Sequence, residues 1–131
     1  MVDMKVSLAG IELCNPVVPA SGTCGFGVEL NDAYDINVLG GLSLKGTTGE
    51  PRYGNECPRI AECEGGMLNA VGLQNPGIDV FVNEKLPALR RIYKGCIIAN
   101  ISGFSLEEYV HCCEMADKAP ETDIIEVNVS C

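Results

Sequence analysis

The sequence predicts an α/β fold, the N-terminal half of a (β/α)8 barrel preceded by a short β-hairpin. Short apolar runs alternate with helical patterns along the chain, which is typical of parallel strands connected by helices. The glycine fingerprint of dinucleotide-binding folds is missing, and so is the Walker phosphate loop. A complete barrel needs about 250 residues. The 131 residues are therefore expected to form a single truncated barrel domain.

The expected strands are short and mostly apolar. A turn at Gly10 joins two apolar segments and predicts a hairpin over about residues 4–14. Barrel-type strands are then expected over residues 16–20, 39–44, 96–100 and 124–129. The polar segment 49–66 is long for a compact domain, which indicates a functional loop. A complete open sheet is the alternative, but the sequence stops directly after the last strand, which favours an interrupted barrel.

Helical patterns occupy the segments between these strands. A short helix is expected over residues 28–34, and a longer one over 75–93 that Pro87 disturbs because proline lacks a backbone donor. Ser105 and Glu108 form a capping box that begins the last helix. The buried face of that helix is expected to comprise Leu106, Tyr109, Val110, Cys113 and Ala116.

Composition and charge restrict the possible partners. The net charge of -9 argues against nucleic acid and anionic membranes, which need basic patches. No apolar run approaches the roughly 20 residues that span a bilayer. Residues 1–5 lack the layout of a signal peptide, so a cytoplasmic location is expected.

The cysteines are expected to be reduced thiols rather than disulfides or metal ligands. The chain has 8 cysteines, but no two of them have the C-x-x-C spacing of a structural zinc site, so no metal is expected. The single histidine, His111, is expected on a helix surface. Without a second histidine, Ser-His or Cys-His nucleophilic chemistry has little support.

Polar residues follow the apolar runs where a barrel enzyme would need them. Ser21, Lys45, Asn100 and Asn128 each lie at the C-terminal end of an expected strand, and Cys131 lies shortly after Asn128. Catalytic groups of (β/α)8 barrels come from these strand ends. Each residue also has a structural explanation, as a turn residue or a solvated charge. The amide of Asn128 is the hardest to explain that way, because burying an amide without partners costs on the order of 1–3 kcal/mol.

Longer motifs resemble the dihydroorotate dehydrogenase family over essentially the whole chain. The resemblance is carried by Asn15–Gly22, Lys45–Thr48, Pro51–Asn55, Pro58–Arg59, Met67–Gly77, Ile98–Asn100 and Asn128–Cys131. The run Gly72–Gly77 and the cysteine at position 131 look most like the class 1, B-type catalytic subunit. The membrane-bound class instead has an N-terminal extension and a serine base.

The resemblance implies a barrel that holds FMN at its C-terminal mouth and oxidises dihydroorotate to orotate in pyrimidine synthesis. Cys131 matches the base that takes a proton from C5 while a hydride leaves C6. The positions that match FMN contacts are Ser21, Lys45, Gly46, Asn100 and Asn128. The positions that match the dihydroorotate pocket are Lys45, Asn69, Ala70, Val71, Gly72, Leu73 and Asn128.

The resemblance also implies partners. B-type catalytic subunits pair with a second subunit that carries FAD and an iron–sulfur cluster and passes electrons to NAD+, and a homodimer of catalytic subunits in a heterotetramer is expected. The later barrel units that supply the flavin phosphate site are not in the sequence, so the chain alone is expected to be inactive. Two alternatives remain: the related FMN-dependent dihydropyrimidine dehydrogenase, and a non-catalytic half-barrel that associates through its open edges.

Overall fold

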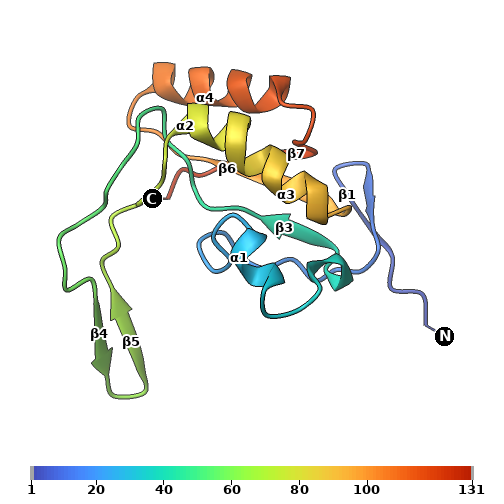
Figure 1. Ribbon diagram of the computed structural model, residues 1–131, viewed down its shortest axis with the longest axis horizontal. Coiled ribbons are helices and arrows are strands. Elements are labelled where there is room, and N and C mark those ends of the chain that lie inside the picture. Colours follow the sequence, from blue (N-terminus) through green and yellow to red (C-terminus); the bar gives the residue numbers. More distant parts are fainter. Residues whose placement is uncertain (1, 131) are drawn as a thin grey trace.

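A parallel sheet covered on one face by helices forms the body of the molecule, in a computed structural model that describes residues 2–130 (Figure 1). The sheet has 3 strands in the order β3-β6-β7. Their bounds are Gly41–Ser43, Cys96–Ile101 and Ile124–Val127. The helical segment that ends in α3 (Leu86–Ile92) connects β3 to β6, and α4 (Leu106–Lys118) connects β6 to β7. This alternation confirms the α/β prediction.

The hydrophobic core lies between the sheet and the helices. Leu42, Leu44, Ile97 and Ile101 are 0% exposed and pack against helical side chains such as Leu89. Alternate residues of a strand point to opposite faces. The residues between them, such as Ser43 and Asn100, therefore face the side of the sheet that the helices leave open.

The N-terminal hairpin consists of β1 (Val6–Leu8) and β2 (Ile11–Leu13), paired antiparallel. Ala9 and Gly10 make its turn with φ of 50° and 85°, the backbone that a two-residue type I′ turn requires. Leu13 packs against Cys96 and Ile98, so the hairpin covers the N-terminal end of the open face.

The long helix contains the irregularity expected at Pro87. It begins with α2 (Ile78–Val80), continues as the π-helical segment η2 (Phe81–Lys85), and ends with α3. Pro87 offers no amide to the preceding turn, and its ring crowds the carbonyl four residues back. The wider π turn accommodates this and leaves both Phe81 and Leu86 at 0% exposure.

The prediction of a strand over residues 16–20 is wrong. This segment lies outside the sheet, and Gly40 N donates to Val17 O at 3.0 Å as its backbone contact with the start of β3. Pro16 and Pro19 have no amide hydrogen, so the segment lacks two of the donors that a ladder would use. The helix expected over 28–34 is shorter, as α1 (Val28–Asn31), and a 3-10 turn η1 (Ile36–Val38) follows it.

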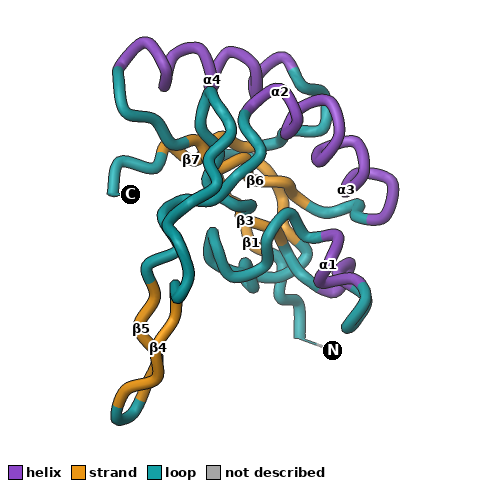
Figure 2. The backbone as a smooth tube through the Cα atoms, turned by 60° about the vertical axis from the view of Figure 1, so that its left-hand side comes forward, coloured by secondary structure: helices purple, strands orange, loops and turns teal. Residues whose placement is uncertain are grey.

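The segment expected as a loop over 49–66 is in part a projecting hairpin arm. Its strands are β4 (Ile60–Cys63) and β5 (Gly66–Asn69), paired antiparallel and exposed along their length. Figures 1 and 2 show this arm extending away from the body. Arg52 and Asn75 exchange backbone hydrogen bonds of 2.8 and 3.0 Å at the base of the arm, which ties its two ends together.

The last helix has the predicted cap but a different buried face. Ser105 Oγ accepts from Glu108 N at 3.1 Å, while the Glu108 carboxylate accepts from Phe104 N and from Gly49 N. Leu106 and Val110 are 75% and 49% exposed, against the expectation. The face toward the core is formed by the predicted Tyr109, Cys113 and Ala116 together with Cys112 and Met115, which were not predicted. The contact of Glu108 with Gly49 fixes the rotation of the helix over the sheet.

Two further findings concern the described residues. Within residues 2–130, no helix is long and apolar enough to cross a membrane. The cysteines of this part of the chain are unpaired, and burial raises the pKa of the Cys112 thiol to about 11, with the charge of Glu108 as a second cause.

Candidate active site

The C-terminal ends of the strands meet at a cavity of about 470 Å³, which we call the inner cavity. Its lining brings together every position that the resemblance assigns to FMN. The lining residues are Ala20, Ser21, Gly22, Lys45, Gly46, Leu73, Asn100, Glu126, Val127, Asn128, Val129 and Ser130. Residues that are far apart in the sequence converge here because parallel strands all end at the same edge of a sheet.

Asn128 is held from two neighbouring elements. Its Nδ2 donates to Asn100 Oδ1 at 3.2 Å, and its backbone N donates to Ile101 O at 2.8 Å. The hydroxyl of Tyr109, on α4, donates to Asn128 O at 2.5 Å. These hydrogen bonds give the half-buried Asn128 the partners that it needs. They hold the side chains of Asn100 and Asn128 at the cavity wall.

Gly46 permits a close approach of the backbone to these amides. A Cβ at this buried position would stand 2.9 Å from both Asn100 Oδ1 and Ser102 Oγ, closer than real Cβ contacts. The Ser102 hydroxyl is itself buried, and it has no hydrogen-bond partner within residues 2–130. Any side chain at position 46 would therefore have to displace Asn100 or Ser102.

Lys45 and Ser21 connect the first loop to the end of β3. Ser21 Oγ donates to Leu44 O at 2.5 Å, and Lys45 N donates to Gly25 O at 2.9 Å. The Nζ of Lys45 lies over Gly22, 3.9 Å from where a Cβ of that glycine would be. The ammonium group of Lys45 thus stands at the cavity mouth, over a residue that leaves space for it.

A second cavity of about 600 Å³, which we call the outer cavity, adjoins the inner one and shares Gly22 and Lys45 with it. Val71 lines the outer cavity and Leu73 the inner one. The other substrate-pocket candidates, Asn69, Ala70 and Gly72, lie outside both linings, with Asn69 paired opposite Ile60 in the arm. The structure therefore brings together only part of the predicted substrate set.

The loop of these substrate candidates is anchored by a buried amide. Leu73 has the unusual φ of 55°, next to Gly72 at 77°. Asn75 holds this turn, because its Nδ2 donates to Leu73 O at 2.9 Å and its Oδ1 accepts from Thr48 N at 3.1 Å and Gly77 N at 3.0 Å. Asn75 was not singled out from the sequence, and its sequence signal is the Asn-Pro-Gly turn.

Sequence reasoning also missed Glu126. It lines the inner cavity, and its Oε2 accepts from the Ser43 hydroxyl at 2.5 Å across β6. The signal was present, because Glu126 and Asn128 are two positions apart and so share one face of a strand. The carboxylate of Glu126 thus lies on the open face of the sheet, next to the amides of Asn100 and Asn128.

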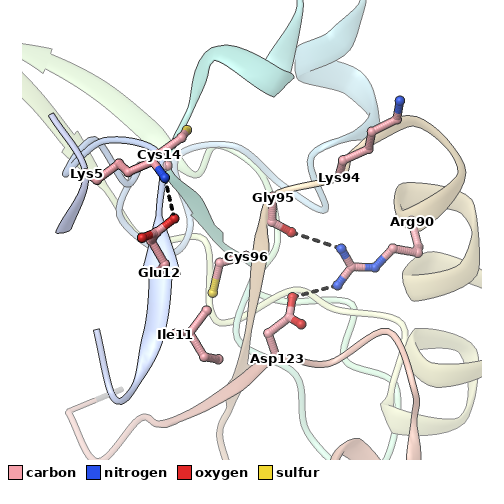
Figure 3. A pocket seen from close by; sticks show the side chains of 10 residues that line it. Lys5, Ile11, Glu12, Cys14, Arg90, Lys94, Gly95, Cys96 and Asp123 are labelled. Atoms are coloured by element: carbon pink, nitrogen blue, oxygen red, sulfur yellow. Dashed lines mark hydrogen bonds and ion pairs between the residues drawn. The ribbon is translucent and has the colours of Figure 1, made fainter. Parts of the chain in front are cut away.

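The opposite end of the sheet has a cavity of different character, the basal cavity, of about 300 Å³ (Figure 3). Four of its charged residues form two ion pairs: Lys5 Nζ lies 2.7 Å from Glu12 Oε1, and Arg90 Nη2 lies 2.6 Å from Asp123 Oδ2. Burial, and then the charge of Asp123, raise the pKa of the Cys96 thiol there, so it is a poor nucleophile. Features at this end of a barrel serve stability rather than catalysis.

The sequence model of the family described as dihydroorotate dehydrogenase matches residues 3–131. The chain belongs to the dihydroorotate dehydrogenase family. It is 51% identical, over 100% of its length, to a protein of Cutibacterium acnes named dihydroorotate dehydrogenase B (NAD(+)), catalytic subunit. It is 52% identical, over 98% of its length, to the protein of that name from Streptococcus pneumoniae.

The fold comparison agrees with the family. The crystal structure of the dihydroorotate dehydrogenase of Eimeria tenella in complex with ferulenol matches 98% of this chain with a TM-score of 0.72 at 20% identity. The half-barrel prediction is thereby confirmed. The chain covers 43% and 41% of the two bacterial relatives and 37% of the Eimeria chain, about two-fifths of a full-length dihydroorotate dehydrogenase.

Cys131, the predicted catalytic base, lies outside the described residues. The structure shows where the other predicted site residues lie. Their roles in binding FMN and dihydroorotate stay predictions. Within residues 2–130, no group of three or more His, Cys, Asp or Glu side chains is arranged to hold a metal ion.

Proposed function

We propose that the protein carrying this sequence oxidises dihydroorotate to orotate in pyrimidine synthesis, with FMN bound in the inner cavity. The observation that carries the proposal is the convergence of Ser21, Lys45, Gly46, Asn100 and Asn128 on one cavity at the C-terminal end of the sheet. The names of the relatives that are 51% and 52% identical support the same activity.

The residues of the inner cavity fit a flavin. Its volume of about 470 Å³ lies within the roughly 300–1,000 Å³ of small-molecule and cofactor sites. Gly46 lets the backbone approach Asn100 closely, and the amides of Asn100 and Asn128 line the cavity together with the hydroxyl of Ser21. Amides and hydroxyls of this kind can both donate to and accept from the edge of a flavin ring. When bound, FMN supplies the acceptor for the hydride that leaves C6 of the substrate.

The chain's own residues would orient the substrate and move its proton. The Lys45 ammonium offers a fixed positive charge for the carboxylate, and the Asn128 amide offers donors and an acceptor for the pyrimidine ring. The turn from Asn69 to Leu73, including Ala70, Val71 and Gly72, forms the remaining proposed wall. Cys131 is the proposed base, whose thiolate takes the proton from C5. A thiol with an ordinary pKa of about 8.5 needs only modest tuning for this task.

The proposed electron path leaves this chain. The name of the bacterial relatives, with its reference to NAD(+) and to a catalytic subunit, supports a separate electron-transfer subunit. We propose that this subunit carries FAD and an iron–sulfur cluster, and that two catalytic subunits associate in a heterotetramer. A cytoplasmic location stays a prediction.

The test uses a full-length protein that carries this sequence, loaded with FMN and mixed with dihydroorotate in a stopped-flow instrument. Cys131→Ala should slow flavin reduction by about 10²-fold or more, the usual effect of removing a general base. Cys131→Ser should be slow at neutral pH and recover as pH rises, because a hydroxyl is a weaker acid than a thiol. Reduction of the Cys131→Ala flavin at the parental rate would remove this residue from the mechanism.

Lys45 gives a second arm of the test. Lys45→Ala should weaken both FMN retention and dihydroorotate turnover, whereas Lys94→Ala, in the basal cavity, should change neither. Uracil is the comparison substrate, because dihydropyrimidine dehydrogenases act on bases without a carboxylate. Flavin oxidation by uracil from the reduced enzyme, without activity on dihydroorotate, would replace the proposed function by that alternative.

A further inference from the structure

We propose that the outer cavity is an entrance that captures the anionic substrate, with Arg52 and Lys85 as the capturing cations. The inference rests on the proposed function, because it concerns the carboxylate of dihydroorotate. It adds a second binding region to the inner cavity, on the side of the molecule between the first loop, the base of the arm and the long helix.

The charge of the outer cavity is opposite to that of the chain. The whole sequence has 9 basic and 18 acidic residues, so its average field repels a carboxylate. The outer cavity is lined by Lys45, Arg52 and Lys85, with Glu29 as its acid. A cleft lined by charges of one sign focuses the field and raises the local concentration of the oppositely charged ligand.

These cations keep their charge available. Within residues 2–130, the side chains of Lys45, Arg52 and Lys85 make no ion pair and no hydrogen bond. The Arg52 guanidinium instead lies 4.5 Å from the ring centre of Phe104, and Lys85 Nζ lies 6.0 Å from that of Phe26. An aromatic face orients a cation without neutralising it. The cations of the basal cavity, in contrast, include Lys5 and Arg90, both paired with acids.

The outer cavity leads to the proposed reaction site. Lys45 lines both cavities. A carboxylate that first binds near Arg52 or Lys85 can therefore move on to Lys45 and stay close to a positive charge throughout. Val71 and Pro76 give the route an apolar wall against which a flat ring can lie. The ligand class that fits is a small six-membered heterocycle with a single carboxylate.

The experiment compares charge variants of the full-length, FMN-loaded enzyme at low and high salt. Arg52→Gln and Lys85→Gln should each lower kcat/KM for dihydroorotate by about 3- to 10-fold at low ionic strength, because steering effects on association span about 10- to 10³-fold in total. The loss should shrink at about 1 M salt, where the Debye length is only about 3 Å. The change in kcat should be smaller than the change in kcat/KM, and the dissociation constant of orotate, measured by calorimetry, should rise.

Further variants separate capture from folding and packing. Glu29→Gln removes the acid of the outer cavity and should raise kcat/KM at low salt. Arg52→Lys retains the charge and should retain most of kcat/KM. Lys94→Gln, in the basal cavity, removes a cation elsewhere and should leave kcat/KM unchanged.

Losses that do not depend on salt, or equal effects of Lys85→Gln and Lys94→Gln, would overturn the capture role. A parent enzyme that does not reduce its flavin with dihydroorotate would instead contradict the proposed function. The two failures are therefore distinguishable.

Discussion

The two faces of the sheet differ in what covers them and in what their residues do. The face under the helices carries Leu42, Leu44, Ile97 and Ile101, all at 0% exposure. The other face is apolar only near the hairpin, at Ile98, and becomes polar toward its C-terminal end at Asn100 and Glu126. One face therefore supplies the free energy of folding, and the other positions polar groups at a cavity.

This difference teaches where sequence changes should have their effects. On the helix-covered face a lost methyl group leaves a void that the close-packed interior fills poorly. On the open face the same change alters a cavity wall that already meets solvent or a ligand. Stability and ligand binding should thus respond to different residues of the same short strands.

Substitutions on the helix-covered face of the sheet should have the largest effect on stability. Ile97→Ala should lower the free energy of unfolding by about 2–5 kcal/mol, because it deletes fully buried methyl groups from the core. Ile124→Ala, half-buried on the open face of the neighbouring strand, is the matched control and should cost clearly less. Equal losses in urea denaturation would break the comparison.

A smaller effect on stability, joined to a large one on binding, is expected at Gly46. The Cβ of Gly46→Ala would collide with Asn100 Oδ1 and Ser102 Oγ, so the amide must shift. Overpacking of this kind costs about 1–3 kcal/mol, and FMN affinity, measured by fluorescence titration, should fall at least about tenfold, or 1.4 kcal/mol. Gly66→Ala is the control, since its Cβ would meet only Cys63 Sγ, at 3.9 Å. Normal FMN affinity in Gly46→Ala would show that position 46 is no part of the flavin site.

The covered face should also make stability depend on alkaline pH. Burial raises the pKa of Cys112 to about 11 in the folded protein, against about 8.5 for an exposed thiol. The unfolded chain thus loses this proton first, and the free energy of unfolding should fall by up to about 3 kcal/mol as pH rises from about 8.5 to 11. Cys112→Ala should flatten this slope and the exposed Cys63→Ala should not; identical slopes in all three proteins would contradict the assignment.

The smallest effect is expected on the open face, at Ser43. Ser43→Ala removes the hydroxyl that donates to Glu126. The carboxylate is exposed and can bind water instead, so the loss should be only about 1 kcal/mol. Thermal unfolding of Ser43→Ala beside Ser7→Ala, in the exposed hairpin, measures it, and a loss as large as that of Ile97→Ala would contradict the division between the faces.

Sequence patterns predicted the strands of the parallel sheet better than any other element. The apolar runs at β6, which is buried along its length, and at β7, which is half-buried to exposed, required no knowledge of their partners. The run at 16–20 looked similar, but Pro16 and Pro19 remove two of its backbone donors. The arm strands β4 and β5 escaped detection because they bury nothing and so carry no hydrophobic period.

The site was predictable to the extent that it depends on strand ends. Ser21, Lys45, Asn100 and Asn128 were found because each follows an apolar run, and all of them line the inner cavity. The face of α4 was predicted in part: Tyr109, Cys113 and Ala116 pack toward the core, but Leu106 and Val110 do not, because two sets of apolar residues have helical spacing. The choice between them depends on a tertiary contact, the bond from Gly49 N to Glu108.

The π turn at η2 has a consequence for how the chain tolerates a change of length. Leu86 comes five positions after Phe81, and in a regular α-helix the two side chains would point about 140° apart. The wide turn brings both into the core, as if one residue had been inserted into an ordinary helix. Deleting one residue between Phe81 and Leu86 would restore a spacing of four and keep both side chains inward. This stretch is therefore a natural place for relatives to differ by a single-residue gap, whereas the same deletion in α4 would turn its buried face toward water.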